Sequence, residues 1–153
     1  MLPATTSRVA EQTPDYINER IRRDIDERVA RYATLGHAAI QQRIHELDRE
    51  WDIERALEVS ASTVSLLGIG LGTFVRRTWF ILPAVVAGFL LQHALQGWCP
   101  PVPVLRRLGV RTASEIEQER YALKVLRGDF REAESATPNV SAIVNKTLES
   151  VRT

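Results

Sequence analysis

This sequence of 153 residues has a single cysteine, almost no excess of positive over negative charge, and no apolar run at the amino terminus. The single cysteine, Cys99, can form neither an internal disulfide nor a cysteine-based zinc site, which excludes a disulfide scaffold and a zinc-finger module. A net charge of +1, with no basic run interleaved with aromatic residues, argues against nucleic acid as a partner. Residues 1–7 lack the basic and apolar regions of a signal peptide, so we expect no cleavage by signal peptidase.

The sequence also lacks the residue patterns of an enzyme. His37 and His45 lie in a charged segment and match neither a metal-ligand spacing nor a catalytic triad. The acidic residues are interspersed with arginines, which is typical of a solvated helix face and not of a catalytic pair. We therefore predict that the chain is not an enzyme and that it holds no cofactor and no metal.

Charge is almost absent from residues 59–98, where Arg76 and Arg77 are the only Lys, Arg, Asp or Glu side chains. The apolar runs on either side of them, 59–75 and 79–98, would measure about 25 Å and about 30 Å as helices, against about 30 Å for the hydrocarbon core of a bilayer. The link between the runs has room only for a tight turn. We therefore predict an all-α fold built on an integral-membrane hairpin of two helices, with the lipid bilayer as its partner.

The ends of the two runs carry side chains that suit a membrane interface. Guanidinium groups can reach the headgroups, and tryptophan is enriched at the boundary between lipid and water. The predicted interface anchors are Arg76, Arg77, Trp79 and Trp98. More arginines flank the hairpin on the side of the chain ends than lie in its turn, so we expect a multi-pass protein with both termini in the cytoplasm. The flanking arginines are Arg49, Arg55, Arg106, Arg107 and Arg111.

Small residues recur at four-residue spacing on both runs, which lets helix axes approach closely in lipid. They are Gly68 with Gly72 on the first run and Ala84 with Gly88 on the second. These residues either seal the hairpin, or join it to another copy, or reflect only the frequency of glycine in membrane helices. A soluble alternative, with the hairpin buried in a helical bundle, needs more covering helices than this short chain supplies.

The polar segments before the hairpin have helical patterns. Thr13 and Pro14 predict the start of an amphipathic helix, and Gly36 predicts an interruption. Beyond it, an apolar stripe with coiled-coil spacing can pair with a partner helix, lie on the membrane surface or pack on its own neighbour; we favour self-association. The stripe consists of Ile40, Ile44, Leu47 and Trp51.

The segment after the second run is rich in proline, which predicts a sharp helix stop and an extended exit. A capping-box pattern, with either Thr112 or Ser114 as the cap, then opens a helix that ends at Gly128. A weak helix in the tail is indicated by Val140, Ile143, Val144, Leu148 and Val151. The predicted division is a disordered N-terminus (1–12), an amphipathic arm (13–58), the hairpin (59–98), the exit segment (99–112), a cytoplasmic helix (113–128) and a polar tail (129–153).

Cys99 and His93 are the candidates for site chemistry, and each has a simpler alternative. Cys99 follows a helix carboxyl end, where the helix dipole disfavours a thiolate, so we do not expect a nucleophile. Together the two residues suggest ligation of haem or a soft metal, whereas a cysteine packed in a turn is the commoner arrangement. His93, with Gln92 and Gln96, either lines a polar path or reaches the headgroups.

Two short motifs give the chain a resemblance to a known family. Gly97-Trp98-Cys99-Pro100 follows the second run, and Leu108-Gly109-Val110-Arg111-Thr112 comes soon after it. With the hairpin ahead of them, these elements resemble the YgaP-like transmembrane domain family over residues 55–112. The resemblance implies a protein of the bacterial inner membrane, in a proteobacterial subgroup of unassigned function. Some members carry a rhodanese, a sulfur-transfer domain; this chain has none, and Cys99 does not inherit its catalytic role.

From these observations we predict a small integral-membrane protein that serves as an anchoring, interaction or scaffold module and offers cytoplasmic helices to partners. The expected partners are a second copy of the chain, giving a homo-oligomer, or another membrane protein. The alternative comes from a different class: a membrane protein that handles redox, sulfur, metal or haem chemistry through Cys99 and His93.

Overall fold

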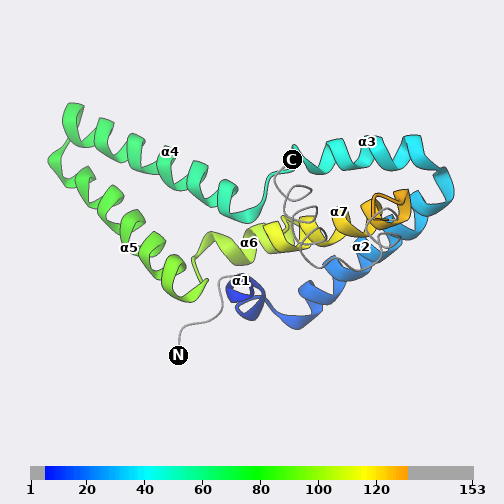
Figure 1. The fold of residues 1–153 in the computed structure, drawn as a ribbon. Coiled ribbons are helices and arrows are strands. Elements are labelled where there is room, and N and C mark those ends of the chain that lie inside the picture. The colour runs from blue at the N-terminus through cyan, green and yellow to red at the C-terminus, as the bar shows by residue number, and fades with distance from the viewer. Residues whose placement is uncertain (1–5, 131–153) are drawn as a thin grey trace, which may run out of the picture.

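The described part of the chain folds mostly into helices. The computed structural model describes residues 6–130, and within them there is no strand, which confirms the all-α fold class (Figure 1). The helices are α1 (Arg8–Glu11), α2 (Asp15–Leu35), α3 (His37–Leu47), α4 (Ile53–Phe74), the 3-10 helix η1 (Arg77–Phe80), α5 (Ile81–Gln96), α6 (Pro101–Arg107) and α7 (Ala113–Arg127). The predictions made for residues 1–5 and 131–153, which include most of the polar tail, lie outside the described residues.

The helices form two parts (Figure 1). α2, α3 and α7 pack together, and α6 and α1 are joined to them by side-chain hydrogen bonds; these five helices are here called the helical base. The neighbouring helices α4 and α5, joined by η1, project from the base and are here called the α4–α5 arm. In the base, α2 and α7 run in the same direction and α3 returns antiparallel to α7, as the side-chain bonds between these helices also indicate.

The apolar stripe of α3 is covered by α7 within the same chain. The cluster that it forms contains Ile40, Ile44, Leu47, Ile116 and Leu123, all buried. Trp51, the last residue of the stripe, is 47% exposed and lies outside the cluster. Our preference for self-association through this stripe is therefore wrong. A helix beyond the membrane runs, far away in sequence, supplies the covering partner.

Part of the amino-terminal segment is helical, so the disorder predicted for residues 1–12 is wrong for Arg8–Glu11. Arg8–Glu11 is helical, and Val9 is buried with Ile53 and Cys99 in an apolar cluster, which gives this short helix a reason to be ordered. The predicted cap is wrong as well, because Pro14 occupies the N-cap position of α2 and no side chain caps the helix. The hydroxyl of Thr13 instead donates to the carbonyl of Val9 at 2.7 Å.

The boundaries of the arm differ from the predicted apolar runs. α4 begins at Ile53 and not at residue 59, because the carboxylate of Asp52 caps it by accepting a hydrogen bond from the backbone N–H of Arg55 at 2.8 Å. At the far end, η1 replaces the predicted tight turn, so α5 begins at Ile81.

Pro101–Arg107 of the proline-rich exit form a helix, so the extended geometry predicted at these prolines is wrong. Pro101 is the first residue of α6 and Pro103 lies in the same first turn, where backbone N–H groups have no acceptor within the helix. α5 ends instead at Gly97, whose φ of 77° lies in the left-handed region. The prolines therefore start a helix after a glycine has ended the previous one.

α7 begins with a reciprocal cap. The Oγ1 atom of Thr112 accepts a hydrogen bond from the N–H of Glu115 at 3.3 Å, and the carboxylate of Glu115 accepts one from the N–H of Thr112 at 2.8 Å. Of the two predicted caps, Thr112 is therefore the one used. The helix ends at Gly128, which has a φ of 88°.

Candidate functional site

The α4–α5 arm exposes an extensive apolar surface. Within the described residues, α4 and the segment Arg77–Gln96 are long and apolar enough to cross a membrane. Only 17% and 6% of their most apolar stretches are buried, so neither is enclosed as the core helix of a soluble protein would be. Leu66, Phe74 and Leu91 are 69%, 89% and 63% exposed. Apolar surface on this scale requires a cover that the described part of the chain does not supply.

Gly68 and Gly72 form the contact between the two helices of the arm. A Cβ atom at Gly68 would lie 2.7 Å from Cδ of Pro83 and 3.1 Å from Cβ of Leu82. A Cβ atom at Gly72 would lie 3.0 Å from the ring of Phe80. Both glycines are buried. The first pair of small residues therefore lets the helices approach closely, which is the first of the roles predicted for these residues.

Ala84 and Gly88 lie on a different face. Both are exposed, and a Cβ atom at Gly88 would meet no atom within 4 Å. They therefore do not seal the arm, because its inner contact is made by the other pair of small residues. The outer face of α5 is open at these two positions.

The predicted interface anchors lie at opposite ends of the arm. Arg76, Arg77 and Trp79 are exposed at its tip, in and beside η1. Trp98 is half-buried at the foot, directly after the glycine that ends α5. The 16 residues of α5 separate the two tryptophans by about 24 Å of helix.

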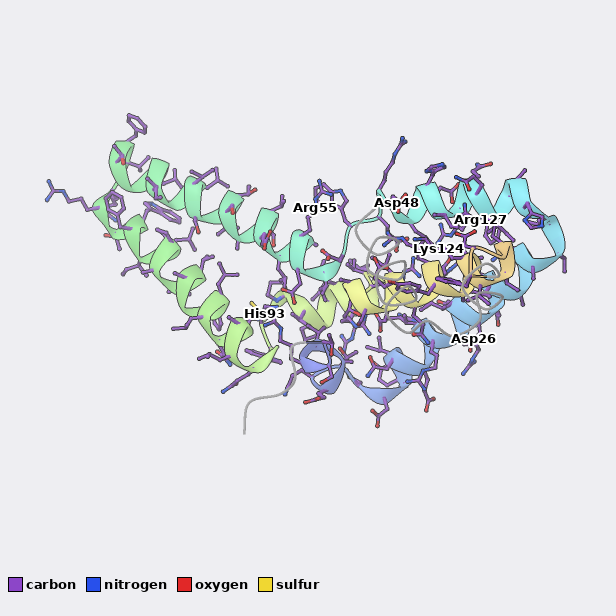
Figure 2. The ribbon with its side chains drawn as sticks, viewed as in Figure 1. Asp26, Asp48, Arg55, His93, Lys124 and Arg127 are labelled. Atoms are coloured by element: carbon purple, nitrogen blue, oxygen red, sulfur yellow. The ribbon has the colours of Figure 1, made fainter. Side chains whose placement is uncertain are left out.

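At the foot of the arm, a cluster of polar side chains joins three helices. Glu54, in the first turn of α4, accepts a hydrogen bond from Nη2 of Arg8 at 2.9 Å and is hydrogen-bonded with Nε2 of His93 at 3.0 Å. Arg8 also donates from Nη1 to the carbonyl of Ala94 at 3.2 Å. His93, labelled in Figure 2 where α5 meets the base, is only 4% exposed. It thus binds inward to α4 and does not reach the surface as a headgroup-contacting side chain would.

Gly97 brings the amino-terminal helix onto this foot. Its left-handed φ favours glycine, and a Cβ atom there would overlap the carbonyl oxygen of Arg8. Glycine is therefore required at this position both by the backbone conformation and by the close approach of α1.

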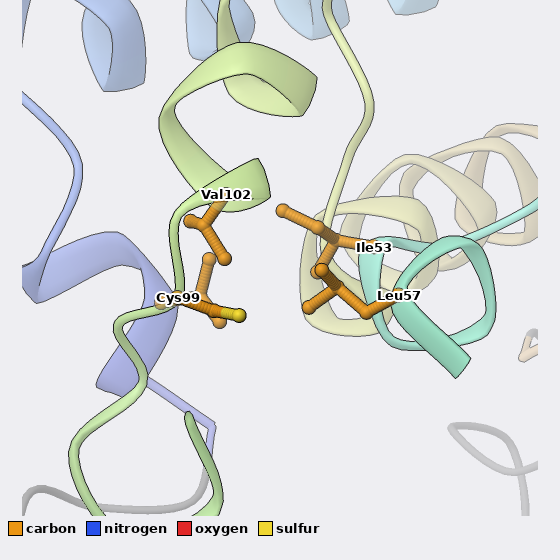
Figure 3. Close-up of a cluster of buried hydrophobic side chains, with 5 residues drawn as sticks. Ile53, Leu57, Cys99 and Val102 are labelled. Carbon is orange, nitrogen blue, oxygen red and sulfur yellow. The ribbon is translucent and has the colours of Figure 1, made fainter. Parts of the chain in front are cut away.

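Cys99 lies in an apolar cluster and not in a ligand set. The cluster consists of Val9, Ile53, Leu57, Cys99 and Val102, and Figure 3 shows the thiol on the side that faces α4. Burial raises the pKa of the Cys99 thiol, which disfavours the thiolate that a nucleophile or soft-metal ligand needs. In residues 6–130 no group of three or more His, Cys, Asp or Glu side chains could hold a metal ion. The geometry therefore offers no support for metal or haem ligation by Cys99 and His93.

A second polar cluster lies inside the base, around Glu119. This carboxylate has no exposed surface and accepts hydrogen bonds from Arg28 at 3.2 Å, from Arg43 at 2.9 Å and from Arg111. Burial alone would raise the pKa of the Glu119 carboxyl, but the hydrogen bonds and charges of Arg43 and Arg111 hold that pKa below its usual value. Arg111 also donates from Nε to Glu50 at 2.7 Å. The network therefore joins α2, α3 and α7 to the segment that leads into α4.

Arg106 forms a third polar contact between distant segments. It has no exposed surface and donates to both carboxylate oxygens of Glu115, at 2.6 Å and 2.7 Å, and to the amide oxygen of Asn18 at 2.9 Å. Burial by itself would raise the pKa of the Glu115 carboxyl, yet the hydrogen bonds from Arg106 and from Thr112 lower it. The bidentate pair fixes α6 against α7 and α2.

Sequence reasoning identifies His93 but misses the residues around it. In the sequence Glu54 is only an acidic residue three positions after Trp51, the last residue of the apolar stripe, and Arg8 lies in a segment predicted to be disordered. An acidic residue in the first turn of an apolar helix is the available signal for Glu54, because such a charge is costly near lipid unless it is paired. Glu119 and Arg106 give no comparable signal, since their partners are distant in sequence and have no fixed spacing.

Fold and site together define an all-helical protein that carries two exposed apolar helices on a compact, charged base. No family model, curated protein or solved structure matches the chain. Its function is therefore argued from the geometry of the arm and the base.

Proposed function

We propose that the chain is a small integral-membrane protein whose α4–α5 arm is a transmembrane hairpin and whose helical base is a cytoplasmic interaction module. The observation that carries the proposal is the contrast between the parts: the base buries the apolar stripes of α2, α3 and α7 in two clusters, whereas only 17% and 6% of the most apolar stretches of the arm are buried. The 22 residues of Ile53–Phe74 and the 20 of Arg77–Gln96 measure about 33 Å and about 30 Å, close to the hydrocarbon thickness of about 30 Å. Insertion into the bilayer would remove this apolar surface from water, which is favourable by about 25 cal/mol of free energy per Å².

The arrangement of the ends supports the proposed topology. Both helices of the arm join the base at the same end, and the tip, with Arg76 and Arg77, lies at the other (Figure 1). This arrangement supports a topology in which the base and the tip would lie at opposite faces of the membrane. The excess of arginines beside the base favours the cytoplasm for this face. The resemblance to the YgaP-like family supports the bacterial inner membrane as the location.

The proposed role is anchoring and interaction rather than catalysis, with a second copy or another membrane protein as the partner in the bilayer. The outer face of α5 supports such a contact, because Ala84 and Gly88 are exposed there and would let a helix of the partner approach closely. In the cytoplasm, the helical base would then contact the same partner protein.

Single-cysteine labelling in intact spheroplasts tests the topology. In a Cys99→Ala background, Thr78→Cys places a thiol at the tip, while Gln42→Cys and Ser114→Cys place thiols on the base; all three positions are exposed. A membrane-impermeant maleimide should label the tip thiol without lysis and the two base thiols only after lysis. Fractionation of the same cells should place the protein in the membrane pellet and release it with detergent but not with alkaline carbonate.

Two results would contradict the proposal. Recovery of the whole protein in the high-speed supernatant without detergent would mean that the arm is covered in some other way. Labelling of the base thiols before lysis, with the tip thiol protected, would reverse the orientation and remove the cytoplasmic role of the base.

A further inference from the structure

A cavity of about 440 Å³ opens at the tip of the α4–α5 arm, beside the turn between the two helices. Three exposed residues with polar groups line it where the turn leads into α5: Arg76, Thr78 and Trp79. Three apolar residues of the first turns of α5 continue the lining toward the base: Ile81, Leu82 and Val85. The cavity therefore passes from a cationic group at the tip to an apolar wall within a few residues.

A second cavity continues the first one toward the base. It has a volume of about 270 Å³, lies between α4 and α5, and is lined almost entirely by apolar side chains down to Cys99. Val85 lines both cavities, so they meet at this side chain. From Ile81 to Leu90, α5 measures about 14 Å, close to the hydrocarbon thickness of one leaflet, about 15 Å. The two cavities together therefore form a groove with the length and the lining that suit one acyl chain.

The positive charge at the head of this groove has no counter-ion in the described structure. Within residues 6–130, the guanidinium group of Arg76 has neither an ion-pair nor a hydrogen-bond partner. Residues 59–114 contain no acidic side chain, and Glu58 lies about 24 Å of helix before the end of α4 at Phe74. An unpaired guanidinium group is suited to a phosphate, to which it can donate two parallel hydrogen bonds.

We propose that this groove binds one anionic phospholipid, with the phosphate at Arg76 and one acyl chain along α5. The inference rests on the proposed insertion of the arm, in which the lipid belongs to the leaflet farther from the base. The indole of Trp79 suits the boundary between headgroup and chain, and the hydroxyl of Thr78 can donate to a phosphate oxygen. Charge then selects the headgroup, because a zwitterionic lipid would bring a second cation beside the arginine.

The lining favours a lipid over the other occupants of such a groove. A free phosphate would pair with Arg76 but would leave the apolar walls uncovered. A partner helix has its own proposed contact at Ala84 and Gly88, and neither residue lines either cavity. The lipid and the partner helix would therefore occupy different faces of α5.

Two adjacent arginines provide a matched pair of variants. Arg76 lines the tip cavity and Arg77 does not, although both are exposed and each substitution removes one positive charge. Native mass spectrometry of full-length protein, released from micelles that contain phosphatidylglycerol or phosphatidylethanolamine, measures the lipid that stays bound. The wild type should retain phosphatidylglycerol several-fold more than phosphatidylethanolamine. This retention should fall several-fold in Arg76→Gln and stay unchanged in Arg77→Gln; equal losses in both variants, or no lipid preference in the wild type, would overturn the site.

A second pair of variants tests the path of the acyl chain. Val85→Trp fills the groove where the two cavities meet, whereas Leu91→Trp adds the same side chain at a position that is 63% exposed and lines neither cavity. Retention of phosphatidylglycerol should fall several-fold in Val85→Trp only. Equal retention in the two variants, or displacement of the lipid by millimolar inorganic phosphate, would overturn the proposal. Circular dichroism checks folding, and the arginine pair decides if Val85→Trp does not fold.

Fractionation of the same proteins separates this inference from the proposed function. Recovery of the wild type in the supernatant without detergent would contradict membrane insertion and the lipid site together. Protein that stays in the membrane pellet but shows no preference between the two lipids would overturn the lipid site alone.

Discussion

Glu119 is a carboxylate with no exposed surface, and it is held by arginines from three separate segments: Arg28 of α2, Arg43 of α3 and Arg111 ahead of α7. Taking a charge out of water is unfavourable unless other charges and hydrogen bonds replace the water. Arg43 and Arg111 also pair with Glu50, whereas Glu119 is the one ion-pair partner of Arg28 within residues 6–130. Loss of the negative charge would therefore leave Arg28 without its carboxylate and remove one of the carboxylate partners of Arg43 and Arg111.

We predict that Glu119→Gln lowers the free energy of unfolding by about 3 kcal/mol, the usual scale for breaking a buried ion pair from one side. Glu117→Gln is the matched control on the same helix, because Glu117 is 45% exposed and, among residues 6–130, pairs only with Arg120. Its effect should be below about 1 kcal/mol. Denaturant unfolding of both variants in the same detergent measures the difference; equal losses would mean that the buried network does not stabilise the base.

The same residue sets the direction of a pH dependence. The folded-state pKa of Glu119 is lowered, by the arginine hydrogen bonds acting against burial, relative to about 4.3 in the unfolded chain. The stability that it contributes is therefore fully present above about pH 4.3 and is lost as the pH falls through the folded-state pKa. Glu115 acts in the same direction, so the wild type alone does not isolate Glu119. The difference in unfolding free energy between wild type and Glu119→Gln should shrink as the pH falls below about 4.3, and a constant difference would contradict this.

Gly97 permits a second comparison between single residues. Gly97 and Gly109 both have left-handed φ values, 77° and 87°, but only Gly97 has the backbone of Arg8 against it. Gly109→Ala should cost about 1 kcal/mol for the backbone conformation alone. Gly97→Ala should cost at least twice as much, because its Cβ also pushes α1 off the foot. Thermal unfolding of the two variants measures the gap, and equal melting temperatures would mean that α1 does not rest on Gly97.

At the scale of elements, the arm depends on a contact that only glycine allows. Gly68 has Pro83 and Leu82 against it, whereas a Cβ atom at Gly70, on the same helix, would meet no atom within 4 Å. Gly68→Leu should force α4 and α5 apart and lower the melting temperature in detergent by several degrees. Gly70→Leu should leave it nearly unchanged, since its side chain would enter the surrounding lipid or detergent. A similar loss in both variants would show that helix propensity, and not the helix contact, sets the stability of the arm.

The elements that could be predicted from the sequence are those with local causes. The amphipathic period of α2 and α3, the break at Gly36 and the cap of α7 at Thr112 all depend on residues a few positions apart. The two apolar helices were evident because their composition alone sets them apart. The two errors have different origins. α6 was missed because prolines in the first turn of a helix are tolerated, whereas proline was taken only as a helix stop. α1 was missed because residues distant in sequence order it.

The candidate site was less predictable than the fold for the same reason. His93 stood out as a polar residue in an apolar run, but Glu54 is 39 positions away and Arg8 is farther still. No spacing rule joins residues at such separations. The Glu119 network has the same character, because Arg28 and Arg43 come from helices that precede the arm and Glu119 from one that follows it.

At the scale of the whole molecule, the arm lies between α3 and α6 in the sequence, yet helices from both sides of it pack together in the base. The clusters of α2, α3 and α7 include no residue of the arm beyond its first turns. The foot is held by Ile53, Leu57 and Cys99, and by the bonds of Glu54 with Arg8 and His93. Most of α4 and α5 therefore contributes nothing to the packing of the base.

This separation predicts that the base folds without the membrane-spanning part of the arm. Val64 and Phe89 line the same groove between α4 and α5, so their positions are close enough to be bridged. Replacing residues 64–89 by about ten Gly and Ser residues, with a mean span of about 17 Å, keeps the foot and removes most of the exposed apolar surface. The shortened chain should remain in the supernatant without detergent, stay helical by circular dichroism and melt cooperatively, while the full chain pellets with membranes. A shortened chain that still pellets in folded form would locate a second membrane contact on the base, and one that fails to fold would mean that the arm is part of the core.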